Sequence, residues 1–183
     1  MATIVVQTRR LTLRHLREAD APFILELLND PLWVRFIGNK SVDSIPGAVA
    51  YIARAQRMYA EKGFGLWMVE RRGDGAPLGL CGLIKRDTLP DVDLGFGFVS
   101  RHHGQGYGYE SAAAVVALGR ERFALPRIVG VTSPDNDASS ALLRKLGFSF
   151  ERDMEWTAGE PAKLFSMELA PAGGSSRKTA RVS

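Results

Sequence analysis

The sequence predicts a mixed α/β fold, in which one mixed sheet has helices packed on it. Short apolar runs and alternating polar and apolar segments, typical of strands, recur along the chain. Between them lie segments whose apolar residues have helical spacing. Gly, Pro, Asn and Asp residues mark the ends of these segments. The expected order is β-α-α-β-β-β-α-β-α-β-β, without an internal repeat or an interdomain linker.

The first part of the chain predicts one strand and two helices. Residues 8–14 alternate polar and apolar side chains, as a half-buried strand does. Residues 18–22 open a helix that Asn29-Asp30-Pro31 closes. A loop through residues 33–38 follows, and capping residues then begin a second helix that runs to about Lys62.

The remainder of the chain predicts six more strands and two more helices. The strands are expected at residues 64–71, 77–86, 92–99, 127–132, 148–156 and 162–169. Arg72-Gly73-Asp74-Gly75 has the composition of a hairpin turn between the first two of these strands. The helices are expected from the end of a glycine-rich loop to about Phe123, and at residues 138–146.

Length and charge indicate one globular domain with a short tail. A chain of 183 residues can bury a core without disulfides or metal, and the domain is expected over residues 1–170. Residues 171–183 are expected to form a flexible basic tail, since Gly, Ser and Ala alternate there with three basic side chains. Without those three, 21 Lys and Arg residues stand against 20 Asp and Glu residues, which does not favour a nucleic-acid partner.

The sequence also bears on location and metal binding. No stretch approaches the ~18 apolar residues that span a bilayer, and no secretory signal is recognisable. A cytoplasmic protein without a membrane partner is therefore expected. Cys81, the single cysteine, lies in an apolar stretch and predicts a buried, inert thiol. Since no metal-ligand cluster surrounds it, no metal is expected.

The most informative segment is the glycine loop, residues 101–108, with the sequence Arg-His-His-Gly-Gln-Gly-Tyr-Gly. It follows an apolar run typical of a strand and leads into a helix start. Glycines let the main chain approach a ligand, and the free N–H groups and dipole of a helix N-terminus favour negative charge. The loop therefore predicts a pyrophosphate site, although a flexible turn would show the same glycine alternation.

Three separated blocks resemble the GNAT family of acyl-CoA-dependent N-acyltransferases, and most of all its RimJ/RimL-like branch. The blocks are residues 8–14 with Glu18-Ala19-Asp20, Gly95-Phe96 ahead of residues 104–111, and Asn136-Asp137-Ala138-Ser139 with residues 143–148. Their order and spacing carry the resemblance, which covers nearly all of residues 8–169. It implies the GNAT fold and an N-acetyltransferase that moves an acetyl group from acetyl-CoA to a primary amine by direct attack in a ternary complex.

The resemblance also implies the residues that hold acetyl-CoA. In this family two strands splay apart and the pantetheine arm lies between them, so Gly97 and Phe98 would pair with it through their main chains. Backbone amides of the glycine loop would hold the pyrophosphate, namely those around His103, Gly104, Gln105, Gly106, Tyr107 and Gly108. Glycines at 95 and 97 fit a close backbone approach, although a twisted strand with nothing beside it would also have them.

Three polar residues of the last block receive roles from the resemblance. Asn136 would hydrogen-bond the pantetheine through its side-chain amide, or it is simply a turn residue or helix cap. Ser139 would protonate the departing thiolate, or its hydroxyl only caps a helix. Lys145 would reach the nucleotide phosphates, or it is only solvated.

Asp93 is the first candidate for the general base. It lies on the strand that leads to the cofactor, where the branch often has a glutamate, and the shorter aspartate would favour a water relay. Its alternative interpretation is an exposed position of an alternating strand. Glu110 compensates the helix dipole, and His102 and His103 are expected to position phosphate or shape the loop. Glu160 remains open as a group that faces the acceptor.

The acceptor pocket is expected between the first two helices, their connection and the last hairpin. Large side chains there are Trp33, Phe36, Trp67 and Trp156, and Arg35 would meet an acidic acceptor. The leading acceptor is the α-amine of a protein N-terminus, by likeness to the branch alone. The alternatives are a small-molecule amine, an aminoacyl-tRNA, or a non-catalytic acyl-CoA sensor. The oligomeric state, a homodimer included, stays open.

Overall fold

The computed structural model describes residues 3–156 and 159–169, and the predicted tail at 171–183 lies outside them. Eight strands form one sheet in the order β1-β2-β3-β4-β5-β6-β8-β7. The strands are β1 (Ile4–Gln7), β2 (Leu11–Arg14), β3 (Leu66–Arg71), β4 (Pro77–Lys85), β5 (Val92–Phe98), β6 (Arg127–Thr132), β7 (Ser149–Glu155) and β8 (Pro161–Glu168). The helices are α1 (Ala21–Leu28), α2 (Pro31–Ile37), α3 (Ile45–Lys62), α4 (Tyr107–Glu121) and α5 (Asp137–Leu146), with 3-10 turns η1 (Glu18–Asp20) and η2 (Ser100–His102).

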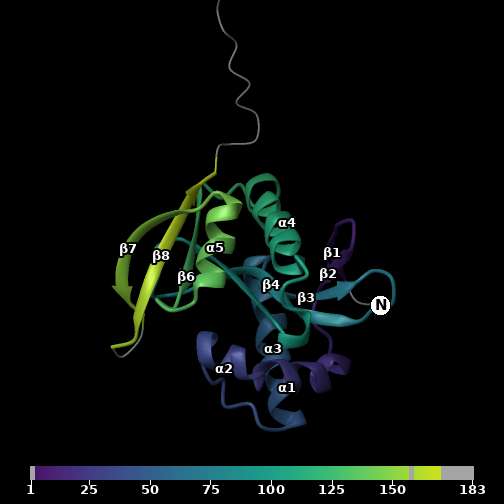
Figure 1. Cartoon of the computed structure of the whole chain (residues 1–183). Coiled ribbons are helices and arrows are strands. Elements are labelled where there is room, and N and C mark those ends of the chain that lie inside the picture. Colours follow the sequence, from purple (N-terminus) through teal and green to yellow (C-terminus); the bar gives the residue numbers. More distant parts are fainter. Residues whose placement is uncertain (1–2, 157–158, 170–183) are drawn as a thin grey trace, which may run out of the picture.

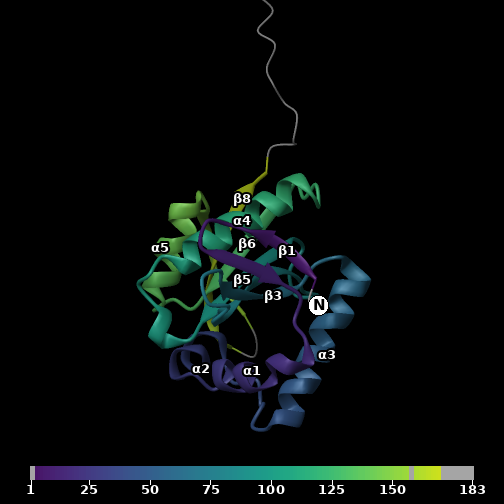
Figure 2. The same ribbon diagram turned by 90° about the vertical axis from the view of Figure 1, so that its right-hand side faces the viewer.

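The helices lie on both faces of the sheet. Helices α1, α2 and α3 lie on one face, and α4 and α5 lie on the other (Figure 1, Figure 2). Each face has its own apolar core. On the α1–α3 side, Ile24 and Ile52 pack with Met68 of β3. On the α4 side, Val115 packs with Leu83 and other strand residues, so burial on both faces holds the central strands in place.

The sheet opens between β5 and β6, which run parallel, whereas all other neighbours are antiparallel. Only Val92 with Ile128 and Asp93 with Val129 are paired. Strand β5 nevertheless continues to Phe98. The two strands therefore diverge beyond Asp93, and the main chain of β5 has an edge without a partner strand there. We call this opening the β5–β6 wedge.

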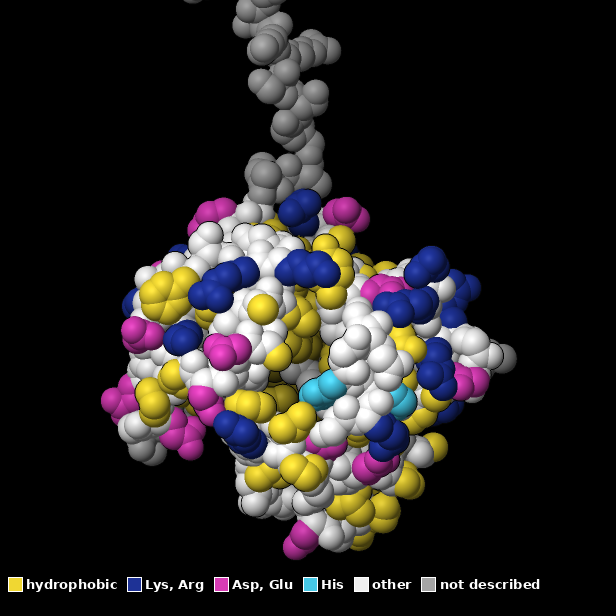
Figure 3. Space-filling model, in the orientation of Figure 1, with side chains coloured by type: hydrophobic (Ala, Val, Ile, Leu, Met, Phe, Trp, Pro, Cys, Tyr) yellow, Lys and Arg dark blue, Asp and Glu magenta, His cyan; other side chains and the backbone are white. Residues whose placement is uncertain are grey.

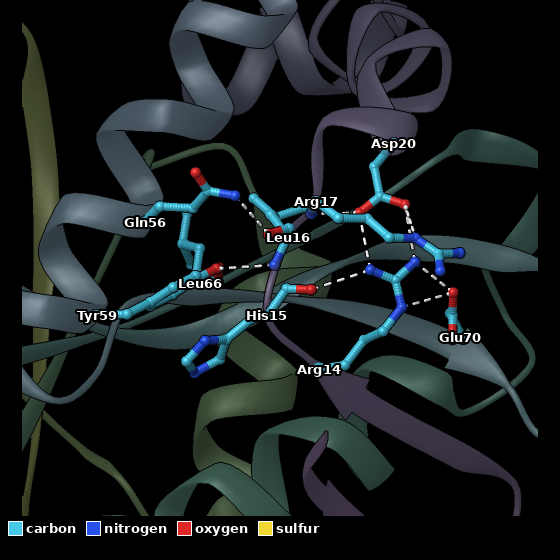
Figure 4. Close-up of polar contacts among 9 residues, drawn as sticks. All are labelled: Arg14, His15, Leu16, Arg17, Asp20, Gln56, Tyr59, Leu66 and Glu70. Atoms are coloured by element: carbon cyan, nitrogen blue, oxygen red, sulfur yellow. Dashed lines mark hydrogen bonds and ion pairs between the residues drawn. The ribbon is translucent and has the colours of Figure 1, made fainter. Parts of the chain in front are cut away.

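A buried ion network fixes the entry to the helices (Figure 4). Arg14 of β2 is only 4% exposed, and its guanidinium pairs with Asp20 of η1 and with Glu70 of β3. These ion pairs and the hydrogen bond from Arg14 to the His15 carbonyl satisfy a charge that would be costly to bury alone. The network thus ties β2, η1 and β3 together.

Two elements differ from the sequence prediction. Residues 8–14 do not form one strand: they contain the turn of a hairpin whose first strand, β1, was not expected, and Thr8 N–H bonds the Leu11 carbonyl across that turn. Residues 33–37, expected as a loop, belong to α2. The reason is that Asp30 and Pro31, which follow α1, also begin a helix: the Asp30 carboxylate accepts from the Leu32 amide, and Pro31 suits the first turn.

Candidate active site

The glycine loop presents unsatisfied amides at the start of α4. Gly104 and Gly106 both have positive φ, +73° and +79°, a region that favours glycine. Among the described residues, the N–H groups of residues 104–109 have no hydrogen-bond acceptor, and no side chain caps α4. The His103 N–H, by contrast, bonds the Ser100 carbonyl at 3.1 Å because η2 ends there. The loop therefore offers a concave set of donors to an anion.

Side chains around the loop hold its shape. His103 Nε2 lies 2.9 Å from the Phe98 carbonyl, and the His102 ring meets the edge of Tyr107. Burial, assisted by the nearby Arg101, lowers the pKa of His102. Glu110 accepts from the Thr8 hydroxyl and the Arg10 guanidinium, both at 2.6 Å. The Glu110 carboxylate therefore makes structural contacts at the first turn of α4.

A basic surface pocket of about 500 Å³ adjoins the loop. It is lined by Gly106 and Tyr109 of the loop and α4, by Arg9 and Arg10, and by Lys145 of α5. The Lys145 ammonium lies 4.6 Å from the centre of the Tyr109 ring. Seen in the orientation of Figure 1, the surface has a hollow lined by hydrophobic side chains, with a histidine on its rim and Lys and Arg side chains nearby (Figure 3). Lys145 therefore lies in the same pocket as Gly106 of the loop.

The strand glycines have a packing role that the sequence did not reveal. A Cβ on Gly97 would lie 2.4 Å from the Trp33 ring of α2, and one on Gly95 would lie 2.9 Å from Ile84. Helix α2 thus rests directly on β5, and it also meets the chain after β6, since Ser133 donates to the Phe36 carbonyl. Because α2 contacts both sides of the β5–β6 wedge, it forms part of the wall around that opening.

Asn136 and Ser139 lie beyond β6, on the other side of the wedge from Phe98. The Asn136 side-chain oxygen accepts from the Ser139 amide at 3.1 Å and caps α5. Its amide nitrogen and the Ser139 hydroxyl have no hydrogen-bond partner among the described residues. Asn136 is therefore a helix cap and still has two N–H donors for a ligand.

Asp93 lies at the vertex of the wedge, where β5 and β6 part. Its neighbour Leu94 packs in the α4-side core, so the Asp93 side chain faces the α1–α3 side. Asp93 is 3% exposed, so it does not occupy an exposed strand position. Oδ2 accepts from Arg86 Nε at 2.7 Å, whereas Oδ1 has no hydrogen bond of normal geometry with described residues. Burial raises the pKa of Asp93, and the opposing effect of Arg86 is smaller.

The other candidate residues lie in the core or at the surface. Arg35, expected to meet an acidic acceptor, pairs with Asp135 at 3.0 Å. Trp67 lies in the core, and burial raises the pKa of the Cys81 thiol to about 12, which makes it a poor nucleophile. Glu160 is exposed in the turn before β8. In the part of the chain that the structure describes, no three His, Cys, Asp or Glu side chains gather to bind a metal, and no helix has the length and hydrophobicity to cross a membrane.

The fold and sequence have known relatives. A family model described as the acetyltransferase (GNAT) domain matches residues 10–149. The uncharacterized N-acetyltransferase YoaA of Bacillus subtilis (strain 168) is 30% identical over 148 residues, which cover 80% of this chain and 84% of YoaA.

Solved structures have the same architecture. An acetyltransferase from Agrobacterium tumefaciens str. C58 has a TM-score of 0.78 at 24% identity, covering 90% of this chain and 94% of that one. RimL, a ribosomal L7/L12 alpha-N-protein acetyltransferase solved with coenzyme A, has a TM-score of 0.78 at 18% identity, covering 91% and 98%. With most of its sequence matched by the family model and a relative of 30% identity, the chain belongs to the GNAT family of acetyltransferases.

Proposed function

We propose that this N-acetyltransferase binds acetyl-CoA across the glycine loop and the β5–β6 wedge. The observation that carries the proposal is the run of six unsatisfied amides, residues 104–109, at the start of α4. They would receive the pyrophosphate, with Lys145 beside it. The pantetheine arm would lie against the free edge of β5 at Gly97 and Phe98 and meet the amide group of Asn136.

The proposed reaction is a direct attack of a neutral amine on the thioester. The amine nitrogen forms a bond to the carbonyl carbon, the carbon–sulfur bond breaks, and the sulfur leaves with the electron pair. Asp93, directly or through one water, accepts the proton that the amine loses. Ser139 donates a proton to the thiolate and regains one from solvent. The raised pKa of Asp93 fits this role, because a carboxylate of ordinary pKa is a weaker base.

The acceptor is a primary amine, for which we keep two classes. RimL, one of the similar structures, acts on a protein α-amine according to its name, and this supports a protein N-terminus in a RimJ/RimL-like enzyme. A small-molecule amine is the second class, because a fold does not determine a substrate. The cytoplasm is the proposed location, since acetyl-CoA is available there.

The test is release of coenzyme A from acetyl-CoA in the presence of a panel of peptides and small amines. We expect transfer to at least one primary amine. Asp93→Asn should lower kcat/KM by about 10²-fold to 10⁴-fold, the usual contribution of a general base, while the Kd of acetyl-CoA stays within about twofold. Tight acetyl-CoA binding without any transfer would instead identify a non-catalytic sensor.

A further inference from the structure

Arg86 lies beside Asp93, the candidate general base. It follows β4, and residues 84 and 86 project to the same face as Asp93, since Ile84 is the register partner of Asp93. Arg86 Nε donates to Asp93 Oδ2 at 2.7 Å. Its side chain is 35% exposed, so one end of the guanidinium touches the buried carboxylate while the other reaches solvent.

The outer part of the Arg86 guanidinium is available for a ligand. Among the described residues, its two Nη groups have no hydrogen-bond acceptor. The Trp156 ring lies 5.1 Å from its Cζ and holds the planar group in position. A fixed guanidinium with free Nη groups is the shape that binds a carboxylate through two parallel hydrogen bonds.

A second cation lies near Arg86. Lys40, from the loop after α2, has electrostatic interactions with Arg86 and with Glu160. Tyr51 of α3 has electrostatic interactions with Arg86 and with Arg54. Lys40 therefore adds to the attraction that Arg86 has for an anionic ligand.

The floor beside these charges is apolar. Ile84 and Leu66 close over Gly95, next to Asp93 on the same face. A small ligand at this point would therefore contact a carboxylate, a guanidinium and an aliphatic surface together.

We propose that Arg86 binds a carboxylate of the acceptor while Asp93 takes the proton from its amine, so that the acceptor is an α-amino acid. The argument is geometric. One guanidinium contacts both the base and the incoming anion, so the amine and carboxylate of the acceptor must be separated by very few bonds. An α-amino acid carries both groups on one carbon, whereas a peptide N-terminus has an uncharged amide in place of the carboxylate. This inference rests on the proposed function and selects the small-molecule class within it.

The experiment compares l-leucine with l-leucinamide, which have the same side chain and differ at the carboxylate. Each kcat/KM is expressed per neutral α-amine, because the carboxylate of leucine also raises the pKa of its amine. Coenzyme A release should be about 10-fold to 100-fold more efficient in kcat/KM with leucine, the range that charge-assisted hydrogen bonds provide. Arg86→Gln should reduce this ratio to about one, and Arg86→Lys should restore part of it. Arg57→Gln, a change at an exposed arginine of α3, should leave the ratio unchanged. The ratio isolates recognition, because any damage to Asp93 would affect both acceptors alike.

A binding measurement keeps the proposal testable if the variants fold poorly. In the wild-type protein with coenzyme A, N-acetyl-l-leucine should bind at least about 10-fold more tightly than N-acetyl-l-leucinamide. Equal use of leucine and leucinamide, or a preference for an amidated leucyl peptide, would overturn the inference and leave the proposed acetyl transfer intact. If no amine is acetylated, the proposed function fails and this inference fails with it.

Discussion

Asn136 uses the two ends of one side-chain amide differently. Its oxygen caps α5, and its nitrogen is directed to no described residue. Asn136→Asp keeps the capping oxygen but removes the N–H donors, so stability should be retained while the Kd of acetyl-CoA rises about 10-fold. Asn136→Ala should lose both functions and cost about 1 kcal/mol of unfolding free energy. Calorimetry and urea unfolding measure the two effects, and unchanged acetyl-CoA binding in Asn136→Asp would leave Asn136 as a helix cap alone.

Ser139 contributes its backbone amide to that cap, while its hydroxyl has no described partner. Ser139→Ala therefore leaves the cap intact and removes only the proposed proton donor. We expect kcat to fall about 10-fold to 100-fold with little change in the Kd of acetyl-CoA. Single-turnover kinetics with the amine in excess measures this, with Ser140→Ala, one residue along α5, as a comparison. If turnover is unaffected, water or another side chain protonates the thiolate.

Some features of the candidate site could be predicted from the sequence, and others could not. The position of the glycine loop at a helix start could be, because glycine spacing and a helix start are local signals. Burial of Asp93 was not, since an alternating pattern does not tell which face is covered. The packing of Gly97 against Trp33 was also out of reach, because it depends on a contact between residues far apart in the chain.

The loop before α4 depends on the left-handed conformations of Gly104 and Gly106. Gly106→Val puts a β-branched side chain at φ +79° and close to Arg10, which should distort the loop and weaken acetyl-CoA binding at least about 10-fold. Gly75→Val is the matched control: Gly75 also has positive φ and open space around its Cα, but it lies in the β3–β4 turn. Isothermal titration of both variants should show a loss of affinity at position 106 only. Equal affinity in Gly106→Val would argue against the anion site.

Helix α2 shows why the element order was only partly predictable. The same three residues, Asn29-Asp30-Pro31, end one helix and start the next, and a sequence pattern shows the stop more clearly than the restart. Strand β1 is a four-residue edge strand with little buried surface, and its apolar residues, Ile4-Val5-Val6, do not alternate with polar ones. The central strands were predicted well because both of their faces are buried, and α4 was because buried residues recur along one side of it.

At the scale of the whole molecule, the Arg14 network joins the sheet to the helical layer. Breaking a buried ion pair leaves a charge without its partner, so Asp20→Asn should lower the free energy of unfolding by about 3–5 kcal/mol at pH 7. Asp74→Asn removes a carboxylate from a solvent-exposed pair with Arg71 and should have a much smaller effect. Urea unfolding of both variants provides the comparison. Similar losses of unfolding free energy would mean that the buried ion pair contributes no more to stability than the exposed one.

The same residue predicts a pH dependence of stability. Although burial opposes it, hydrogen bonds and charge from Arg14 and Arg17 lower the pKa of Asp20 below its usual 3.8. Its contribution to stability is thus fully present above pH 3.8 and is lost as the pH falls through the lower pKa of the folded state. The difference between wild type and Asp20→Asn should shrink over that interval. A constant difference would show that Asp20 does not account for acid sensitivity.

Glu110 connects the glycine loop to the beginning of the chain. Its carboxylate is held by Thr8 and Arg10, and Arg10 Nη1 also bonds the Gln105 carbonyl at 3.0 Å. A shortened protein starting at Leu11 would keep that carboxylate at the helix entrance without the cation that neutralises it. That unneutralised negative charge would then repel the diphosphate that we propose binds at the start of α4. Amino-terminal tags and deletions in this enzyme would therefore alter the surroundings of the glycine loop, although they lie far from it in the sequence.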